Sequence, residues 1–541
     1  MNSMNQAKKQ NFNSLYPIIL FCFLAVSAFL LFWNLGGYSL WDDESMISLA
    51  AQGVLQSGDT SVVHGQNIVA FREGILLKDL HDRSTPPLSA YLAALPIGLL
   101  GTSSFAARLP FAVIGFALMI GFAFCAWKDR LRSSTILVIA IAILGNVSLM
   151  LFLRQARYYA PTVLLSVIIS YLYLKPCWDR RKAIWMSALL VLLFCASYLN
   201  CVALISCLVV DYLFRGRREN PIRTGLLWKV MGLSFLGFLV IAMIWNPFSC
   251  KYGSYVHSVT PWERFRFFLL SFRDMDAARF MVGGLMLVSV IVAALKRDTW
   301  LWRGLIAVVV YTFTISLLSP QVTTVSLFAD IRYLVPLIPV FIALDVRTLL
   351  LLFGRRRVLL VIVAFLCFWT NLLYAPSLIK KEHRFLTLDY LRELLHPIQE
   401  PYRPVADWIN AHLSEGNTIW VLPDYMAYPL MYHAPKAVYA WQLNEGQRSE
   451  RQFNKLPPIH FKGLEMPDYI IVFGPQVKQI LQMIEEYKAK GVQYKEVDVI
   501  DAYWRDVFRP ELFWRSFRTI EGYDLETDAV YVFKLIASPI R

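Results

Sequence analysis

The chain has 541 residues, of which 57% are hydrophobic and only 17% are charged. A soluble protein of this length carries about a quarter charged residues, so the composition excludes an ordinary soluble protein and predicts a polytopic α-helical membrane protein. The net charge of +14 would suit nucleic acid. The basic residues cluster in short loops between apolar runs, however, so membrane lipids are the expected partner and nucleic acid is not.

Apolar runs recur through the first two-thirds of the chain, and five basic clusters separate them. Short loops rich in Lys and Arg lie on the cytoplasmic side, which puts the N-terminus inside and the C-terminus outside. The first run is longer than a signal-peptide core of roughly 7–15 residues and lacks a clear cleavage site, so we expect a retained helix. Counting this first run, the sequence predicts about eleven spans, with twelve or thirteen as the alternative counts. Their ranges are 15–35, 105–127, 133–153, 158–175, 183–198, 200–214, 226–246, 281–295, 303–318, 331–351 and 358–375.

The first outer loop, residues 36–104, contains a short apolar segment at 86–100 with prolines at its start and middle. We expect an interfacial or re-entrant helix there, because a span would move every later basic loop to the outside. From about residue 376 onward, amphipathic helices alternate with short buried strands. The sequence therefore predicts two domains: a transmembrane domain over 1–375 and a soluble α/β domain on the outer side over 376–541.

Three acids, Asp42, Asp43 and Glu44, follow the first span and open the outer loop. An ionisable group at the membrane is a functional candidate, and a carboxylate can act as a general base. The alternative is helix capping, with Asp42 or Asp43 at the N-cap of a helix over 44–55 and Glu44 near its positive end. Capping does not explain all three acids.

Basic side chains collect at two further places on the outer side. Lys78, His81 and Arg83 precede the proline pair at headgroup depth, where they could bind a phosphate or simply extend into the interface. Arg154 and Arg157 are spaced at i, i+3, so on a helix they would share one face and could bind a phosphate together. Binding of ordinary lipid headgroups is the alternative for this pair.

Arg332 lies at another outer boundary, two residues after Asp330. It could contribute to the same anion site, or it could pair locally with Asp330 and anchor its own helix. The eight cysteines fall almost wholly within apolar runs and form no paired Cys-x-x-Cys motif. They predict neither a disulfide framework nor a cysteine metal site.

Taken in order, these motifs resemble the GT-C superfamily of polyprenyl-phosphate-dependent integral membrane glycosyltransferases. Its members include the lipid A aminoarabinose transferases, the protein O-mannosyltransferases and related bacterial transferases of lipopolysaccharide sugars. The resemblance covers about residues 15–375 and rests on Asp43-Glu44, Pro86-Pro87-Leu88, Ala107-Arg108-Leu109-Pro110, Arg157-Tyr158-Tyr159 and Arg332-Tyr333-Leu334-Val335-Pro336.

The sequence departs from this family at two places. Thr85 stands before Pro-Pro-Leu where relatives often have Lys or His, so Arg83 or Lys78 would have to meet the phosphate instead. The turn around Gln155 lacks the second acid of some relatives, so a two-carboxylate metal site is not expected. No cofactor is required by this reading, and a divalent metal stays open.

The resemblance implies an inverting glycosyltransferase of the bacterial inner membrane with a periplasmic C-terminal domain. Its donor would be a sugar on a polyprenyl phosphate, and its acceptor a hydroxyl of a glycolipid, lipopolysaccharide or other envelope glycan, with a protein less expected. Asp43 would be the general base, and Glu44 would orient it or hold a sugar hydroxyl. The remaining expected site residues are Lys78, Arg83, Arg157 and Arg332 for the donor phosphate, and His81, Arg154, Tyr158, Tyr159 and Tyr333 for substrate binding.

Two other classes stay open. A transporter or flippase of lipid-linked sugars would also have many helices and outer arginines, but it would more often show internal repeats, and none is visible in the sequence. A non-catalytic scaffold for envelope assembly would explain the C-terminal domain but not the ordered polar turns.

Overall fold

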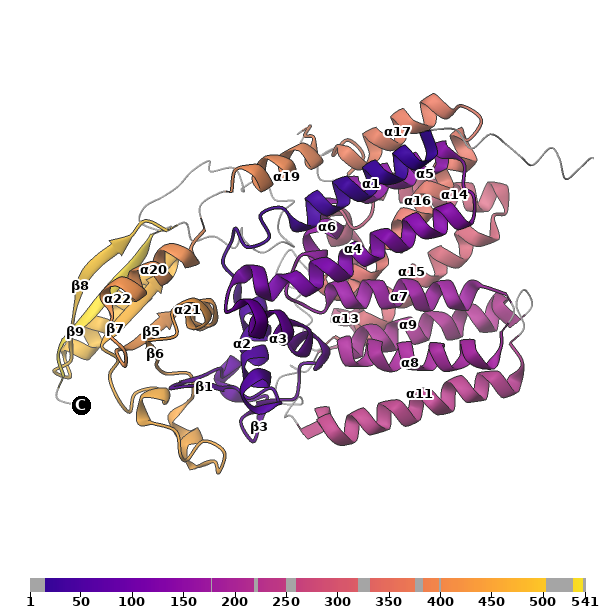
Figure 1. The fold of residues 1–541 in the computed structure, drawn as a ribbon. Coiled ribbons are helices and arrows are strands. Elements are labelled where there is room, and N and C mark those ends of the chain that lie inside the picture. Colours follow the sequence, from indigo (N-terminus) through magenta and orange to yellow (C-terminus); the bar gives the residue numbers. More distant parts are fainter. Residues whose placement is uncertain are drawn as a thin grey trace, which may run out of the picture.

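The computed structural model describes residues 15–176, 178–217, 222–249, 259–319, 331–374, 383–397, 400–502 and 529–538. Apolar helices fill one side of the molecule, a mixed α/β unit lies on the other, and the 36–104 loop lies between them (Figure 1). The helices of the apolar side are α1 (Leu15–Phe32), α4 (Ser104–Lys128), α5 (Ser133–Gly145), α6 (Val147–Leu153), α7 (Tyr159–Leu174), α8 (Arg180–Ala196), α9 (Tyr198–Asp211), α11 (Thr224–Trp245), α14 (Gly283–Lys296), α15 (Thr299–Leu318), α16 (Ile338–Phe353) and α17 (Arg357–Trp369).

A helix or a helix pair occupies each of the predicted spans, which confirms a largely helical membrane fold. Within the described residues, five helices are long and apolar enough to cross a bilayer. The number rises to six if α5 and α6, which meet at a bend of 65°, form one broken span. The predicted count of about eleven is therefore not confirmed by helix length and composition.

The 36–104 loop folds into α2 (Asp42–Ser57), the hairpin strands β1 (Val63–His64), β2 (Asn67–Ile68), β3 (Leu77–Lys78) and β4 (His81–Asp82), and α3 (Leu88–Leu100). α3 has 13 residues, which gives a length of about 20 Å, and a bilayer core is about 30 Å thick. Leu95 and Leu99 leave an apolar face of this short helix exposed. These features suit the interfacial helix predicted there.

The three acids occupy the first turn of α2. The helix begins at Asp42, and its N-cap residue, Trp41, makes no side-chain capping bond. The expectation that Asp42 or Asp43 caps the helix is therefore wrong. The acids instead place negative charge at the positive end of the helix dipole, which is favourable. The helix ends at Gly58, whose φ of 78° lets its N–H bond to the carbonyl of Val54.

The α/β unit has a five-stranded mixed sheet in the order β6-β5-β7-β9-β8. β5 (Thr418–Leu422) is parallel to β6 (Val438–Tyr439) and to β7 (Tyr469–Phe473), whereas β9 (Val530–Ala537) is antiparallel to β7 and to β8 (Gln493–Ile500). The remaining α-helices are α13 (Pro261–Ala277), which lies among the apolar helices (Figure 1), and α19 (Leu386–Leu395), α20 (Tyr402–His412), α21 (Ala427–His433) and α22 (Val477–Lys488).

Alternating residues of the central strands face two separate cores, as the two-residue period of a strand requires. Trp420, Ile470 and Val472 pack with Ile480 and Ile484 of α22 on one face. On the other face, Ile419, Val421, Ile471 and Phe473 join the large core that continues through α20 and α21 into the 36–104 loop. Because this core is shared, the α/β unit holds the 36–104 loop in place and thereby the start of α2.

Candidate functional site

Asp43 is the point at which three distant segments meet. One of its carboxylate oxygens lies 3.1 Å from a guanidinium nitrogen of Arg157, in the turn between α6 and α7. The same oxygen accepts a hydrogen bond from Arg332, in the short 3₁₀ segment Ile331–Leu337 before α16. Arg157 also donates to the backbone carbonyl of Asp43 at 3.3 Å. About a fifth of the Asp43 and Arg332 side chains is exposed, so the cluster remains accessible from outside.

Among the described residues, two guanidiniums surround one carboxylate, so their charges sum to a net positive value. Such a site attracts an anion, because an arginine binds a phosphate through parallel hydrogen bonds. The Nε of Arg157 is buried and has no hydrogen-bond partner among the described residues, so the guanidinium retains an unused donor. The structure thus brings together the predicted base and two of the four predicted phosphate-binding residues.

Tyrosine rings surround Arg157. Its guanidinium carbon lies 5.4 Å from the ring centre of Tyr158 and 5.9 Å from that of Tyr159, and Tyr158 stacks on Tyr333 with ring centres 6.1 Å apart. Tyr158 and Tyr333 are partly exposed beside the cluster. Tyr159 is fully buried, so of the three only the other two are placed to touch a substrate.

Glu44 is fully buried and bound to Arg108 of α4. Arg108 donates from Nε to one carboxylate oxygen at 2.9 Å and from Nη2 to the other at 2.5 Å. The backbone N–H of Ala156 donates to the same carboxylate at 2.8 Å. Glu44 therefore has no free face toward a sugar hydroxyl. Its contacts support the other predicted role, that of orienting Asp43, only indirectly, because Ala156 is adjacent to Arg157, which pairs with Asp43.

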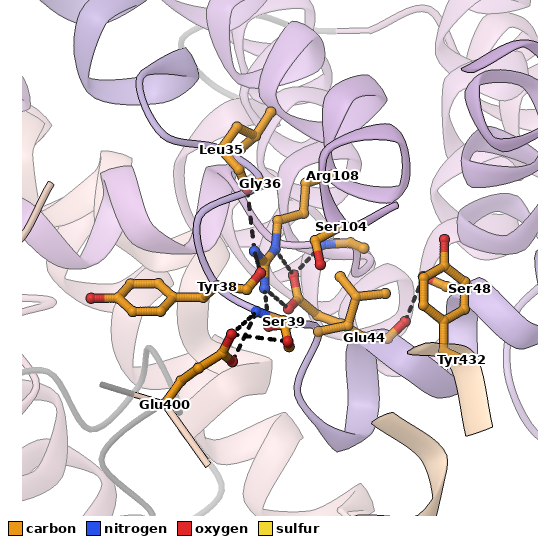
Figure 2. Close-up of polar contacts among 12 residues, drawn as sticks. Leu35, Gly36, Tyr38, Ser39, Glu44, Ser48, Ser104, Arg108, Glu400 and Tyr432 are labelled. Carbon is orange, nitrogen blue, oxygen red and sulfur yellow. Dashed lines mark hydrogen bonds and ion pairs between the residues drawn. The ribbon is translucent and has the colours of Figure 1, made fainter. Parts of the chain in front are cut away.

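Arg108 also organises the loop that leads into α2 (Figure 2). Its Nη1 and Nη2 donate to the carbonyls of Leu35, Tyr38 and Ser39 at 3.2, 2.8 and 2.9 Å. The backbone and hydroxyl of Ser39 in turn donate to Glu400 at 2.9 Å. Arg108 belongs to the Ala-Arg-Leu-Pro motif, but no role was predicted for its side chain. An arginine near the start of an apolar run is itself a signal of a buried partner.

Arg154 lies in the same turn as Arg157 but points elsewhere. It is 9% exposed and donates to the carbonyls of Leu30 and Trp33 at the end of α1, at 2.9 and 2.7 Å. The expectation that Arg154 and Arg157 share a helix face is wrong, because α6 ends at Leu153 and α7 begins at Tyr159. Arg154 fastens α1 to the turn, and its contacts give no support to a substrate-binding role.

Of the predicted residues Lys78, His81 and Arg83, the last two form a second set of contacts, which is centred on Asp59. Arg83 holds Asp59 through two hydrogen bonds of 2.7 and 2.6 Å and lies 4.4 Å from the ring centre of Trp245. The hydrogen bonds from Arg83 lower the pKa of Asp59. His81 lies 3.7 Å from the same carboxylate. Arg83 thereby ties the hairpin to the end of α11 and has its charge already matched, whereas Lys78 is half exposed beside Asp79.

Among the described residues, no group of three or more His, Cys, Asp or Glu side chains is arranged to hold a metal ion. Asp330, the local partner expected for Arg332, lies outside the described residues.

His433 joins the α/β unit to the start of α2 and makes this junction sensitive to acid. Its Nε2 accepts the backbone N–H of Leu40 at 3.2 Å, which requires an unprotonated nitrogen. Burial, together with the charges of Arg108 and Arg403, lowers the pKa of His433 from 6.5 to about 4.

Between pH 6.5 and 4, His433 therefore binds a proton in the unfolded chain but not in the folded chain. The contribution of His433 to the free energy of unfolding is fully present above pH 6.5 and falls as the pH drops through this window. At pH 5 the loss from this residue should be about 2 kcal/mol. We expect His433→Gln, whose amide oxygen can still accept from Leu40, to flatten the fall in unfolding temperature between pH 7.5 and pH 5. An equal fall in wild type and variant would contradict this assignment.

Comparisons with known proteins bear on the fold. No family model matches the sequence, and no curated protein matches it. The crystal structure of ArnT from Cupriavidus metallidurans bound to undecaprenyl phosphate superposes with a TM-score of 0.52 at 12% identity, covering 95% of this chain and 97% of that one. The apo structure of the same ArnT gives 0.54 at 14% identity, covering 86% and 94%. The resemblance predicted from the sequence is thus confirmed at the level of the fold, which this chain shares with ArnT over almost its whole length.

Proposed function

We propose that this chain is an inverting glycosyltransferase that moves a sugar from a polyprenyl phosphate to a hydroxyl of a glycolipid, lipopolysaccharide or other envelope glycan. The observation that carries the proposal is the Asp43–Arg157–Arg332 cluster, which combines a proton acceptor with a cationic anion site. The fold shared with an ArnT that binds undecaprenyl phosphate supports a carrier of this kind.

The cluster suits a single displacement. The acceptor oxygen would attack the anomeric carbon as its proton passes to Asp43, and the bond from that carbon to the phosphate oxygen would break with inversion. The departing polyprenyl phosphate would keep the electron pair and be stabilised by Arg157 and Arg332, so no general acid is needed. In the free protein the two arginines pair with Asp43. A bound phosphate would compete for them and release the carboxylate toward the acceptor.

The proposal includes the topology that the sequence predicts. About eleven spans would cross a bacterial inner membrane, with the N-terminus inside and the transmembrane domain extending to residue 375. The 36–104 loop, the catalytic cluster and the α/β domain after residue 376 would face the periplasm. Purified protein should then transfer radiolabelled sugar from a polyprenyl phosphate to an envelope extract. A flippase or a scaffold would give no transfer in this assay.

Arg157→Glu is expected to weaken binding of undecaprenyl phosphate by about 10- to 100-fold, because a hydrogen bond to a charged group contributes about 1.5–3 kcal/mol. The measurement is the dissociation constant of the full-length protein in detergent. Arg266→Glu is the matched control, since Arg266 is an exposed arginine of α13 and makes the same change in net charge. Unchanged affinity in Arg157→Glu would reject the phosphate role.

A further inference from the structure

A cavity lies behind Glu44, where the 34–44 loop, the end of α6, α19 and the α/β unit meet. Its volume is about 70 Å³, measured as the space open to the centres of water molecules. One water needs about 10–15 Å³ by this measure, so the cavity has room for a group much larger than a water molecule. Its walls include Tyr38, Gln155, Tyr390, Glu393 and Glu400.

Gln155 lines this cavity with a buried polar side chain that lacks hydrogen-bond partners among the described residues. Its side chain is 2% exposed, and neither its amide nitrogen nor its amide oxygen has a partner among the described residues. A buried polar atom without a partner is unfavourable, because it has lost its hydrogen bonds to water. A ligand that satisfies both atoms must accept one hydrogen bond and donate another, which hydroxyl groups do.

The other side chains that line the cavity favour binding of a neutral ring over binding of a phosphate. Three carboxylates, of Glu44, Glu393 and Glu400, line the cavity against two guanidiniums, so the lining has no excess of positive charge to attract an anion. Arg108 and Arg154 also line the cavity, but their guanidiniums are bound to Glu44 and to backbone carbonyls. Aromatic faces next to carboxylate and amide groups match a ring with apolar C–H faces and hydroxyl edges.

The cavity is adjacent to the catalytic cluster but separate from it. The N–H of Ala156 is bound to Glu44; the residue before it, Gln155, faces the cavity, and the residue after it, Arg157, pairs with Asp43. A ring in the cavity would therefore be a neighbour of the reacting sugar. We propose that the cavity is a subsite for a non-reacting sugar ring, either of the acceptor glycan or of a longer carrier-linked glycan. This inference rests on the proposed glycosyl transfer.

Saturation-transfer NMR on the full-length protein in detergent, with a panel of methyl hexosides and pentosides, tests the subsite directly. We expect signal transfer to at least one glycoside, and its loss in Gln155→Leu and in Leu151→Phe, since Leu151 lines the cavity and a larger ring fills it. Gln442→Leu, at a buried glutamine of the α/β unit outside the cavity, should keep the signal. Absence of any signal, or a signal that survives both cavity variants, would mean that the cavity holds only water.

Transfer kinetics then separate the two sources of the ring. For an acceptor ring, Gln155→Leu should raise the KM for the acceptor extract about tenfold, because a lost hydrogen bond is worth about 1.4 kcal/mol, and leave the donor KM unchanged. For a carrier-linked ring, the KM should rise only for carriers bearing more than one sugar. Both KM values unchanged would overturn the subsite. Absence of transfer by the wild type, with glycoside binding intact, would instead reject the proposed function.

Discussion

Asp43→Asn is expected to fold normally and to lose about 10²–10⁴-fold in transfer rate, which is the usual contribution of a general base. Asparagine has nearly the size of aspartate and its amide oxygen can still accept from Arg157 and Arg332, so the cluster should keep its geometry. It cannot take the proton of the acceptor hydroxyl. Binding of undecaprenyl phosphate should be kept or improved, because the competing carboxylate charge is gone. The measurement is kcat with a radiolabelled polyprenyl-phosphate sugar.

Asp42→Asn provides the control for this variant. Asp42 is the adjacent acid in the same first turn of α2 and makes the same change in charge near the same helix end. Its turnover should stay close to that of the wild type. If Asp43→Asn keeps wild-type turnover on the true substrate, Asp43 is not the base.

The charge of the short loops predicted that Asp43, Arg157 and Arg332 lie on the same side of a membrane. The structure brings these three side chains together, although 289 positions separate Asp43 from Arg332. The sequence was not sufficient to decide which neighbouring charges point into the site. Adjacent residues on a helix differ by about 100° in direction, so Asp43 faces the arginines while Glu44 faces the interior.

The wrong predictions for charged side chains arose because the sequence does not show the direction in which neighbouring side chains point. The i, i+3 argument for Arg154 and Arg157 assumed a helix, but residues 154–158 form a turn that directs the two side chains apart. Glu44 and Arg108 are 64 residues apart, and no local sequence pattern predicts that they form an ion pair. Spacing alone could not reveal that Arg83 is matched by Asp59.

In the α/β unit, apolar runs predicted the inner strands but not β8. β5 and β7 are almost wholly buried, so their sequences are continuously hydrophobic. β8 lies at the edge of the sheet and is mostly exposed, and its charged sequence has no such signal. β6 has only two residues, which is too few for any period to be read from the sequence.

Arg108→Met is expected to destabilise the protein by about 3–5 kcal/mol, because it leaves the carboxylate of Glu44 buried without its partner. Glu44 is fully buried and Arg108 is 11% exposed, so solvent cannot screen the remaining charge. Glu44→Gln should be damaging for the converse reason, since it leaves a buried guanidinium unpaired. The measurement is the free energy of unfolding in detergent, with binding of undecaprenyl phosphate as the check on the native state.

The double variant Glu44→Leu/Arg108→Met separates structure from chemistry at this pair. Replacing a whole buried ion pair by apolar groups of similar volume is often neutral for stability, so the double variant should be more stable than either single variant. If Glu44 only positions the turn, part of the transfer activity should return with stability. It should stay reduced to the extent that Ala156 has lost its acceptor and the carbonyls of the 35–39 loop have lost their donor. Restored stability with no activity, combined with wild-type turnover in Asp43→Asn, would instead make Glu44 a reacting group, and the assignment of the base to Asp43 would fail.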